Sequence, residues 1–203
     1  MAILIRNARV LTLEAGDVPR RGLHLGLLSV MDPGDVLIDG GVIAAALPSM
    51  LAGDPRSPTF VPPGGDPDLE IIDAEGRVLM PSFVDCHTHG LWAGDRLDEF
   101  DQKQSGASYL EILESGGGIM STVRAVRSTS ERKLRQALES RLAVMLREGS
   151  TTVEVKSGYG LTTDQELKML SAIHRAAERF PGTVVATALL GHALDPDQDD
   201  FVA

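Results

Sequence analysis

The sequence predicts an α/β protein in which helices pack outside a parallel sheet, preceded by a smaller all-β region. Two observations support this class. From residue 78 onward, strand-like apolar runs alternate with helices of 3.6-residue periodicity, which is the pattern of βαβ units. Before Asp73 the apolar runs are short and bounded by turn residues. We therefore predict two regions, residues 1–76 and residues 77–203.

The first region is expected to consist of short strands and one tight hairpin. Asp39-Gly40-Gly41 separates two apolar runs and predicts a hairpin, because its residues tolerate positive φ. Residues 48–68 are rich in Pro, Gly and Asp and predict a flexible loop, with a lid as the less favoured alternative. The predicted strands are Ala2–Ile5, Val10–Leu13, Leu23–Val30, Val36–Ile38, Val42–Leu47 and Ile71–Ile72.

The second region is expected to run strand, helices, strand, helix, strand. Ser128 and Glu131 fit a capping box for its clearest helix, which Gly149 ends. Thr163 and Glu166 fit a second capping box, for the helix that ends before Pro181-Gly182. The predicted strands are Val78–Val84, Thr151–Val155 and Thr183–Leu190, and two shorter helices are predicted at Ser105–Ser115 and Ile119–Arg127.

Composition excludes several classes of function. The chain has 203 residues and a formal charge of −10, so we expect no nucleic-acid partner, which would need a basic stripe. Cys86 is the single cysteine, which rules out an intrachain disulfide and fits a reducing compartment. The N-terminus lacks a basic signal-peptide start, and no run is long and apolar enough to span a bilayer. We expect a cytoplasmic protein without membrane contact.

The strongest chemical pattern is His87-Thr88-His89, which directly follows an apolar strand. Side chains alternate along extended chain, so His87 and His89 point to one side, with Asp85, and can occupy adjacent positions around one metal ion. Imidazole suits zinc or iron. Cys86 points to the opposite side and is expected to be a small core residue. An isolated His-x-His pair often has only a structural role, so the surrounding sequence decides whether this pair is interpreted as a metal site.

That context resembles the signature of the amidohydrolase superfamily. The matching run is Ile71-Ile72-Asp73-Ala74-Glu75-Gly76-Arg77-Val78-Leu79-Met80-Pro81-Ser82-Phe83-Val84-Asp85-Cys86-His87-Thr88-His89. The resemblance implies a small β-sandwich leading into the first strand of a (β/α)8 TIM barrel. Residues 80–203 would then supply about half of a barrel of roughly 250 residues. We therefore expect a truncated enzyme that does not act alone, with the remaining metal ligands and the general base outside this sequence.

Further segments narrow the resemblance to the imidazolonepropionase family, which opens an imidazolone ring in histidine degradation. They match in order and spacing from about Ile71 onward, and they are Gly94-Asp95-Arg96, Tyr109-Leu110-Glu111-Ile112-Leu113, Gly116-Gly117-Gly118-Ile119, Ser121-Thr122-Val123, Glu154-Val155-Lys156-Ser157-Gly158-Tyr159-Gly160-Leu161 and Gly191-His192-Ala193. The most family-specific of these is the run from Glu154 to Leu161.

The resemblance implies a role for each matching residue. His87 and His89 would bind one zinc or iron ion, and Arg96 would hold the propionate of the substrate. Tyr159 would bind the ring, and His192 would orient and polarise it as the catalytic residue in this sequence. Without the resemblance, we would interpret Arg96 and Tyr159 as ordinary surface and loop residues and leave His192 undecided.

Other residues and alternatives complete the expectations. Lys156 is interpreted as a structural residue, because the family uses one metal, and His24 and His174 as ordinary residues. The substrate is expected to be a small molecule and the protein a homodimer. Two alternatives stay open: another cyclic amidohydrolase, such as a hydantoinase or ring deaminase, and a non-catalytic fragment that oligomerises through an open sheet edge.

Overall fold

A computed structural model describes residues 2–13, 18–49 and 69–195. The chain divides into two compact units between Pro81 and Ser82, whereas the sequence predicted a division after residue 76. Most of the predicted loop at 48–68 and the last eight residues of the chain lie outside the described ranges. None of the helices within these ranges is long and apolar enough to cross a lipid bilayer.

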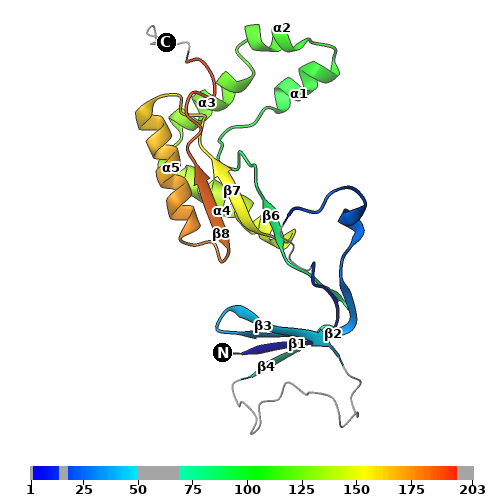
Figure 1. The fold of residues 1–203 in the computed structure, drawn as a ribbon. Coiled ribbons are helices and arrows are strands. Elements are labelled where there is room, and N and C mark those ends of the chain that lie inside the picture. Colours follow the sequence, from blue (N-terminus) through cyan, green and yellow to red (C-terminus); the bar gives the residue numbers. More distant parts are fainter. Residues whose placement is uncertain (1, 14–17, 50–68, 196–203) are drawn as a thin grey trace. The chain divides into compact units, whose positions relative to one another are not determined.

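The first unit contains one mixed five-stranded sheet (Figure 1). Strand β1 pairs antiparallel with β2 and parallel with both β4 and β5, while β2 pairs antiparallel with β3. Its small core contains Ala8, Val10 and Val36. The strands are β1 (Ile3–Leu11), β2 (Val30–Asp39), β3 (Val42–Pro48), β4 (Glu70–Asp73) and β5 (Val78–Leu79).

The predicted hairpin is confirmed, because Asp39 pairs with Val42 across Gly40 and Gly41, whose φ angles are 57° and 82°. Two consecutive positive φ values are the mark of a type I′ turn, whose twist matches that of the flanking strands. Glycine adopts these angles without the steric cost that a side chain would add. This dipeptide therefore sets the register between β2 and β3.

Two strand predictions in this unit were wrong. The runs at 2–5 and 10–13 belong to one strand, β1, which continues through an irregularity at Asn7, where φ is 56°. The run at 23–30 was predicted as a strand, but Gly22–Gly26 forms a short 3₁₀ helix, η1. Leu23 and Leu25 there are 96% and 66% exposed, so this run does not contribute to the core.

The second unit is built on a parallel three-stranded sheet in the order β6-β7-β8, as the strand–helix alternation predicted. Helices α4 and α5 cover one face of the sheet (Figure 1). The strands are β6 (Phe83–Asp85), β7 (Ser150–Lys156) and β8 (Thr183–Thr187). The helices are α1 (Leu97–Gln104), α2 (Tyr109–Glu114), α3 (Ile119–Ser128), α4 (Glu131–Arg147) and α5 (Thr163–Ala177).

The main core lies between this sheet and its helices. Alternation along β7 buries Val153 and Val155 completely on the helix side, while Glu154 and Lys156 lie on the other face. The fully buried core side chains contributed by α4 and α5 are Leu134, Leu138, Leu142, Met169, Ala172, Ile173 and Ala176.

Several strand and helix boundaries differ from the predicted ones for local reasons. The apolar run at 78–84 forms two strands, one in each unit, separated by a segment that contains Pro81, which cannot donate to a ladder. Helix α4 is capped by Ser130, whose hydroxyl accepts from the Lys133 amide, so the predicted capping box at Ser128 was wrong. Helix α1 was not predicted, because it buries no residue and has no apolar stripe.

Each unit has a single sheet within the described residues. The α/β class and the parallel sheet are therefore observed, whereas the second layer of the predicted β-sandwich and the rest of the predicted barrel remain predictions.

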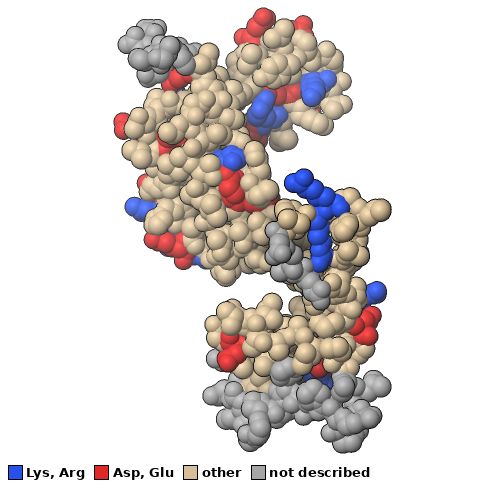
Figure 2. Space-filling view, viewed as in Figure 1, with Lys and Arg blue, Asp and Glu red and all other residues tan. Residues whose placement is uncertain are grey.

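The Lys and Arg side chains on the face seen in Figure 2 form separate groups among the Asp and Glu side chains.

The packing of α4 predicts a clear stability contrast. Leu138→Ala removes a completely buried side chain and should lower the unfolding free energy by about 2–5 kcal/mol. Val144→Ala on the same helix, at a position 46% exposed, should cost about 0.5 kcal/mol. Urea unfolding followed by fluorescence of Trp92, the one tryptophan, measures both. Equal losses would mean that this face of α4 is not the core.

Candidate functional site

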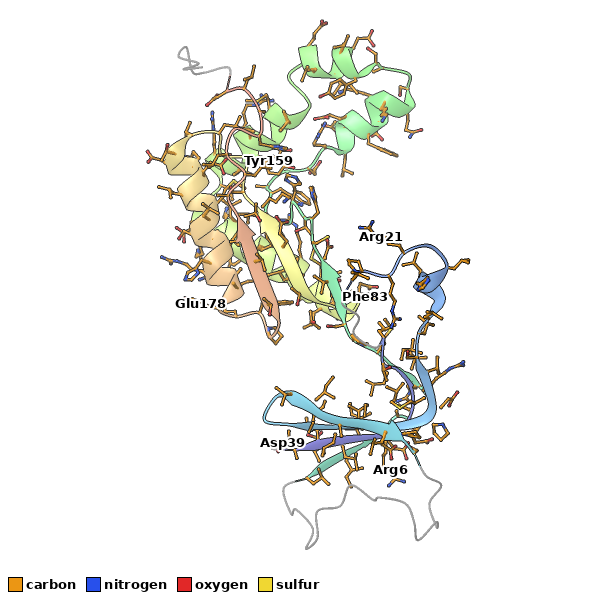
Figure 3. All side chains as sticks on the ribbon, in the orientation of Figure 1. Arg6, Arg21, Asp39, Phe83, Tyr159 and Glu178 are labelled. Carbon is orange, nitrogen blue, oxygen red and sulfur yellow. The ribbon has the colours of Figure 1, made fainter. Side chains whose placement is uncertain are left out.

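The segments that follow the three parallel strands bring the predicted ring residues together. His87 and His89 follow β6, Tyr159 follows β7 and His192 follows β8. Figure 3 shows Tyr159 beyond the arrowhead end of β7. The carboxyl ends of parallel strands meet at one edge of a sheet, which is where α/β enzymes bind their ligands.

His89 is the centre of this ring cluster. Its ring centroid lies 5.0 Å from that of His192, 5.4 Å from that of Tyr159 and 5.9 Å from that of His87. Tyr159 and His192 meet edge to face, with centroids 5.7 Å apart. Four of the five predicted site residues therefore share one location, although they come from three different strand ends.

The surroundings of His89 favour a neutral imidazole. Burial lowers the pKa of His89, and the charges of His192, His87 and Lys156 lower it further against the opposing effect of Glu154. A neutral ring keeps the lone pair that a metal ligand needs. Within the described segments, His89 Nδ1 is buried and has no hydrogen-bond partner, so the ring is not committed to another polar contact through that atom.

The donor set fits part of a metal site. Two imidazoles two residues apart suit zinc or iron as neighbouring ligands. In the ranges that the structure covers, no group of three or more His, Cys, Asp or Glu side chains is arranged to hold a metal. His87 and His89 could thus offer two ligand positions, which is fewer than a tight site requires.

The segment carrying these histidines is joined to β7 by polar contacts around Thr88. The Thr88 amide donates to Glu154 Oε2 at 3.0 Å, and its hydroxyl donates to the Glu154 carbonyl at 2.6 Å. The Lys156 amide donates to the Thr88 carbonyl at 3.0 Å. The Lys156 ammonium pairs with the Glu154 carboxylate, which agrees with the structural role expected for this lysine. These contacts fix the chain between the two histidines.

Arg141 of α4 holds the chain on the far side of His89. Its Nη1 donates to the carbonyls of Gly90 and Trp92 at 3.1 and 3.0 Å. The guanidinium also stacks 3.7 Å from the Trp92 ring centroid, a cation–π contact. The two histidines are thus positioned from both sides by backbone contacts that periodicity does not reveal.

Arg96 lies beside the ring cluster, at the start of α1. Its Nε donates to Glu99 Oε2 at 2.8 Å, and this hydrogen bond raises the pKa of Arg96. Burial raises the pKa of Tyr159, whereas the positive charge of Arg96 lowers it. The two side chains are therefore close enough to interact electrostatically. Arg96 remains 45% exposed. A hollow of about 390 Å³ is lined by Arg96, Glu99, Phe100, Lys103, Tyr109 and Ile112.

Cys86 and Glu166 differ from their sequence predictions, whereas His174 agrees with its prediction. Cys86 was expected in the core but is exposed; it directly follows β6, an edge strand of the described sheet. Glu166 was predicted to cap α5 with Thr163. Instead its buried carboxylate accepts from backbone amides of the loop around Tyr159. His174 is exposed on α5 and pairs with Glu178 at 3.6 Å, as expected of an ordinary residue.

Sequence reasoning missed Thr88, Glu154, Arg141 and Glu166 as residues that shape the site. Irregular backbone next to a strand end leaves amides and carbonyls without ladder partners, and buried ones are satisfied by side chains. The signal available in the sequence was the pair of glycines around Tyr159. Such a turn needs an acceptor nearby, but spacing alone does not identify which carboxylate supplies it.

Comparison with curated proteins gives a consistent result. The chain is 44% identical over 195 residues to an imidazolonepropionase of Rubrobacter xylanophilus, covering 96% of the chain and 45% of the relative. It is 49% identical over 143 residues to an imidazolonepropionase of Hahella chejuensis, covering 68% of the chain and 36% of the relative. The chain thus spans less than half of the length of these relatives. No family model matches it.

Comparison with solved structures supports the fold. An atrazine chlorohydrolase from Arthrobacter aurescens, complexed with zinc, matches 92% of the chain and 35% of its own length with a TM-score of 0.59 at 20% identity. A triazine hydrolase variant matches with the same coverage and TM-score at 18% identity. At these identities the likeness concerns the fold alone.

The polar contacts of Glu154 predict acid sensitivity. Burial favours the neutral carboxyl, but hydrogen bonds from Lys156, Thr187 and the Thr88 amide outweigh it and lower the pKa of Glu154 from 4.5 to about 2. Because the folded pKa is the lower one, this stabilisation is complete above pH 4.5 and disappears as the pH falls toward 2.

Unfolding free energies measured as a function of pH for the wild type and Glu154→Gln test this expectation. The wild type should be the more stable protein at neutral pH, and the difference should shrink as the solution is acidified below pH 4.5. Glu148→Gln, which alters an exposed carboxylate at the end of α4, is the matched control. A difference that does not depend on pH would show that the Glu154 contacts do not stabilise the charged form.

Proposed function

We propose that this chain, which is similar to imidazolonepropionases over nearly its whole length, is part of a metal-dependent hydrolase of cyclic amide C–N bonds. Its substrate would be 4-imidazolone-5-propanoate and its product N-formimidoyl-L-glutamate. The observation that carries the proposal is the meeting of His87, His89, Tyr159 and His192 at the strand ends. The second unit would form the first strands of a (β/α)8 barrel, and the first unit part of a β-sandwich.

His87 and His89 would hold one metal ion, zinc or iron. A solved structure of similar fold is complexed with zinc, which supports a metal cofactor. Such an ion, when bound, lowers the pKa of water toward about 7 and so supplies hydroxide at neutral pH. The lowered pKa of His89 suits this role, because the imidazole stays neutral in the range where the hydroxide is needed.

The chain's own residues would bind and orient the ring. Tyr159 and His192 both lie against His89, so a planar heterocycle bound next to these rings could contact the phenol and the imidazole together. Hydrolysis adds water to the ring carbonyl carbon and breaks its bond to the ring nitrogen, which takes up a proton. Holding the ring at a fixed angle to the incoming oxygen lowers the entropic part of this barrier.

Arg96 would anchor the propionate. A guanidinium is a planar fork that matches a carboxylate. Glu99 occupies the edge formed by Nε and Nη2, so Nη1 would be the guanidinium nitrogen that binds the propionate while the pair stays in place. The pair also keeps Arg96 in place before substrate arrives, because Glu99 accepts from the Gly118 amide at 3.0 Å. The remaining ligands and the general base would come from residues outside this chain. A homodimer in the cytoplasm completes the proposal.

Arg96→Ala should separate the proposed substrate from an uncharged ring. Losing a charged hydrogen bond should reduce kcat/KM for 4-imidazolone-5-propanoate by about ten- to a hundredfold and have little effect on an imidazolone without the carboxylate. Steady-state kinetics on the protein carrying this chain at its natural length measures both. Arg132→Ala removes an exposed arginine of α4 and is the control. Equal losses on the two substrates would favour another cyclic amidohydrolase.

Metal dependence is tested by chelation and by exchange of the two histidines. Treatment with a chelator should abolish hydrolysis, and zinc or iron should restore it. His87→Ala and His89→Ala should each weaken metal binding by more than about a hundredfold in titration calorimetry, because loss of a ligand exceeds the effect of losing its outer partner. His174→Ala, at an exposed histidine of α5, should bind metal normally. Full activity after chelation would rule out this mechanism.

A further inference from the structure

We propose that Glu166 is a positioning residue for the reaction, holding the loop of Tyr159 so that the phenol stays against the site; this rests on the proposed function. Glu166 lies in the first turn of α5 and is 5% exposed. No contact joins it to the rings of His89, Tyr159 or His192 in the described residues, so it would act through the backbone of the loop.

Three backbone amides of the loop converge on the Glu166 carboxylate. Gly158 donates to Oε2 at 2.8 Å, while Gly160 and Leu161 donate to Oε1 at 2.7 and 2.8 Å. Successive amides that point into one concavity form an anion-binding nest, and here the protein supplies its own anion. The position is favourable for a carboxylate in another way, because the N-terminus of α5 is the positive end of its dipole. The nest encloses Tyr159 between its donors.

The two glycines of the loop pack closely against neighbouring segments. A Cβ on Gly160 would lie 2.6 Å from the Glu166 amide nitrogen and 2.8 Å from its Oε1. Gly158 has φ of 111°, and a Cβ there would lie 3.2 Å from His192 Cβ. The backbone on each side of Tyr159 is therefore packed against α5 or against the His192 segment, with glycine at both close approaches.

A second anchor joins this loop to the segment that carries His192. Arg127 Nε donates to the Gly160 carbonyl at 2.9 Å, and its guanidinium pairs with Asp195, which is 6% exposed. Ser157 Oγ accepts from the Leu189 amide at 3.2 Å. These contacts join the loop at 157–161 to the segment at 189–195, and Glu166 would set the position of the tyrosine loop relative to that segment.

The first test measures the loop without any need for activity. Glu166→Gln keeps the shape but offers one acceptor oxygen instead of two, so at least one of the Gly158, Gly160 and Leu161 amides should exchange about tenfold faster or more. With 3-fluorotyrosine, the Tyr159 signal should shift or broaden, while Tyr109, the only other tyrosine, should not change. Asp164→Asn removes an exposed carboxylate from the same helix turn and is the matched control.

The second test is a double-mutant cycle on kcat/KM in the protein at its natural length. Glu166→Gln should reduce kcat/KM about tenfold in the wild type and have little further effect in a Tyr159→Phe background, because the group that it positions is gone. A merely structural role predicts the same loss in both backgrounds. If Glu166→Gln does not fold, Glu166→Asp, which keeps the charge on a shorter arm, is measured in the same way.

The outcomes separate the two proposals. Unchanged amide exchange and an unchanged Tyr159 signal would overturn the positioning role, and so would additive kinetic losses. A wild-type protein that does not hydrolyse 4-imidazolone-5-propanoate would overturn the proposed function, while the exchange and fluorine measurements would still decide whether Glu166 fixes the loop.

Discussion

The arrangement of this site depends on one constraint, the parallel pairing of β6, β7 and β8. Parallel strands place their carboxyl ends at one edge, so the residues that follow them meet although they are far apart in sequence. His89, Tyr159 and His192 become neighbours because of this pairing. The core between the sheet and helices α4 and α5 keeps the three strands aligned, so the geometry of the ring cluster rests on apolar packing on the opposite face of β7.

Polar contacts then fix the irregular segments beyond the strand ends. Glu154 and Thr88 hold the chain between the two histidines, and Glu166 holds the loop of Tyr159. Both carboxylates accept from backbone amides that the sheet ladder leaves free, which is how buried loops avoid the cost of unpaired polar groups. The amides that they accept from belong to Thr88 and to the loop of Tyr159. The chain therefore separates residues that would contact the ring from residues that keep them in place.

The sequence predicted those parts that local pattern controls. The hairpin at Gly40-Gly41, the helix that ends before Gly149, and the place of His87 and His89 directly after a strand are all observed. Prediction failed where tertiary contacts override pattern. The leucines of η1 look like a strand but stay exposed, and α1 has no apolar stripe to reveal it. Glu166 has the spacing of a cap, yet the glycine turn before it presents better donors. Which of these two sets of amides binds the Glu166 carboxylate depends on the tertiary structure and not on sequence spacing.

The central claim is that His87 and His89 bind a single metal ion beside Tyr159 and His192. An anomalous-difference map from crystals of the metal-loaded protein at its natural length tests it most directly. The account predicts one strong peak at the metal's absorption edge, in direct contact with the imidazoles of His87 and His89. A peak located elsewhere, or a second ion bridged by Lys156, would contradict it.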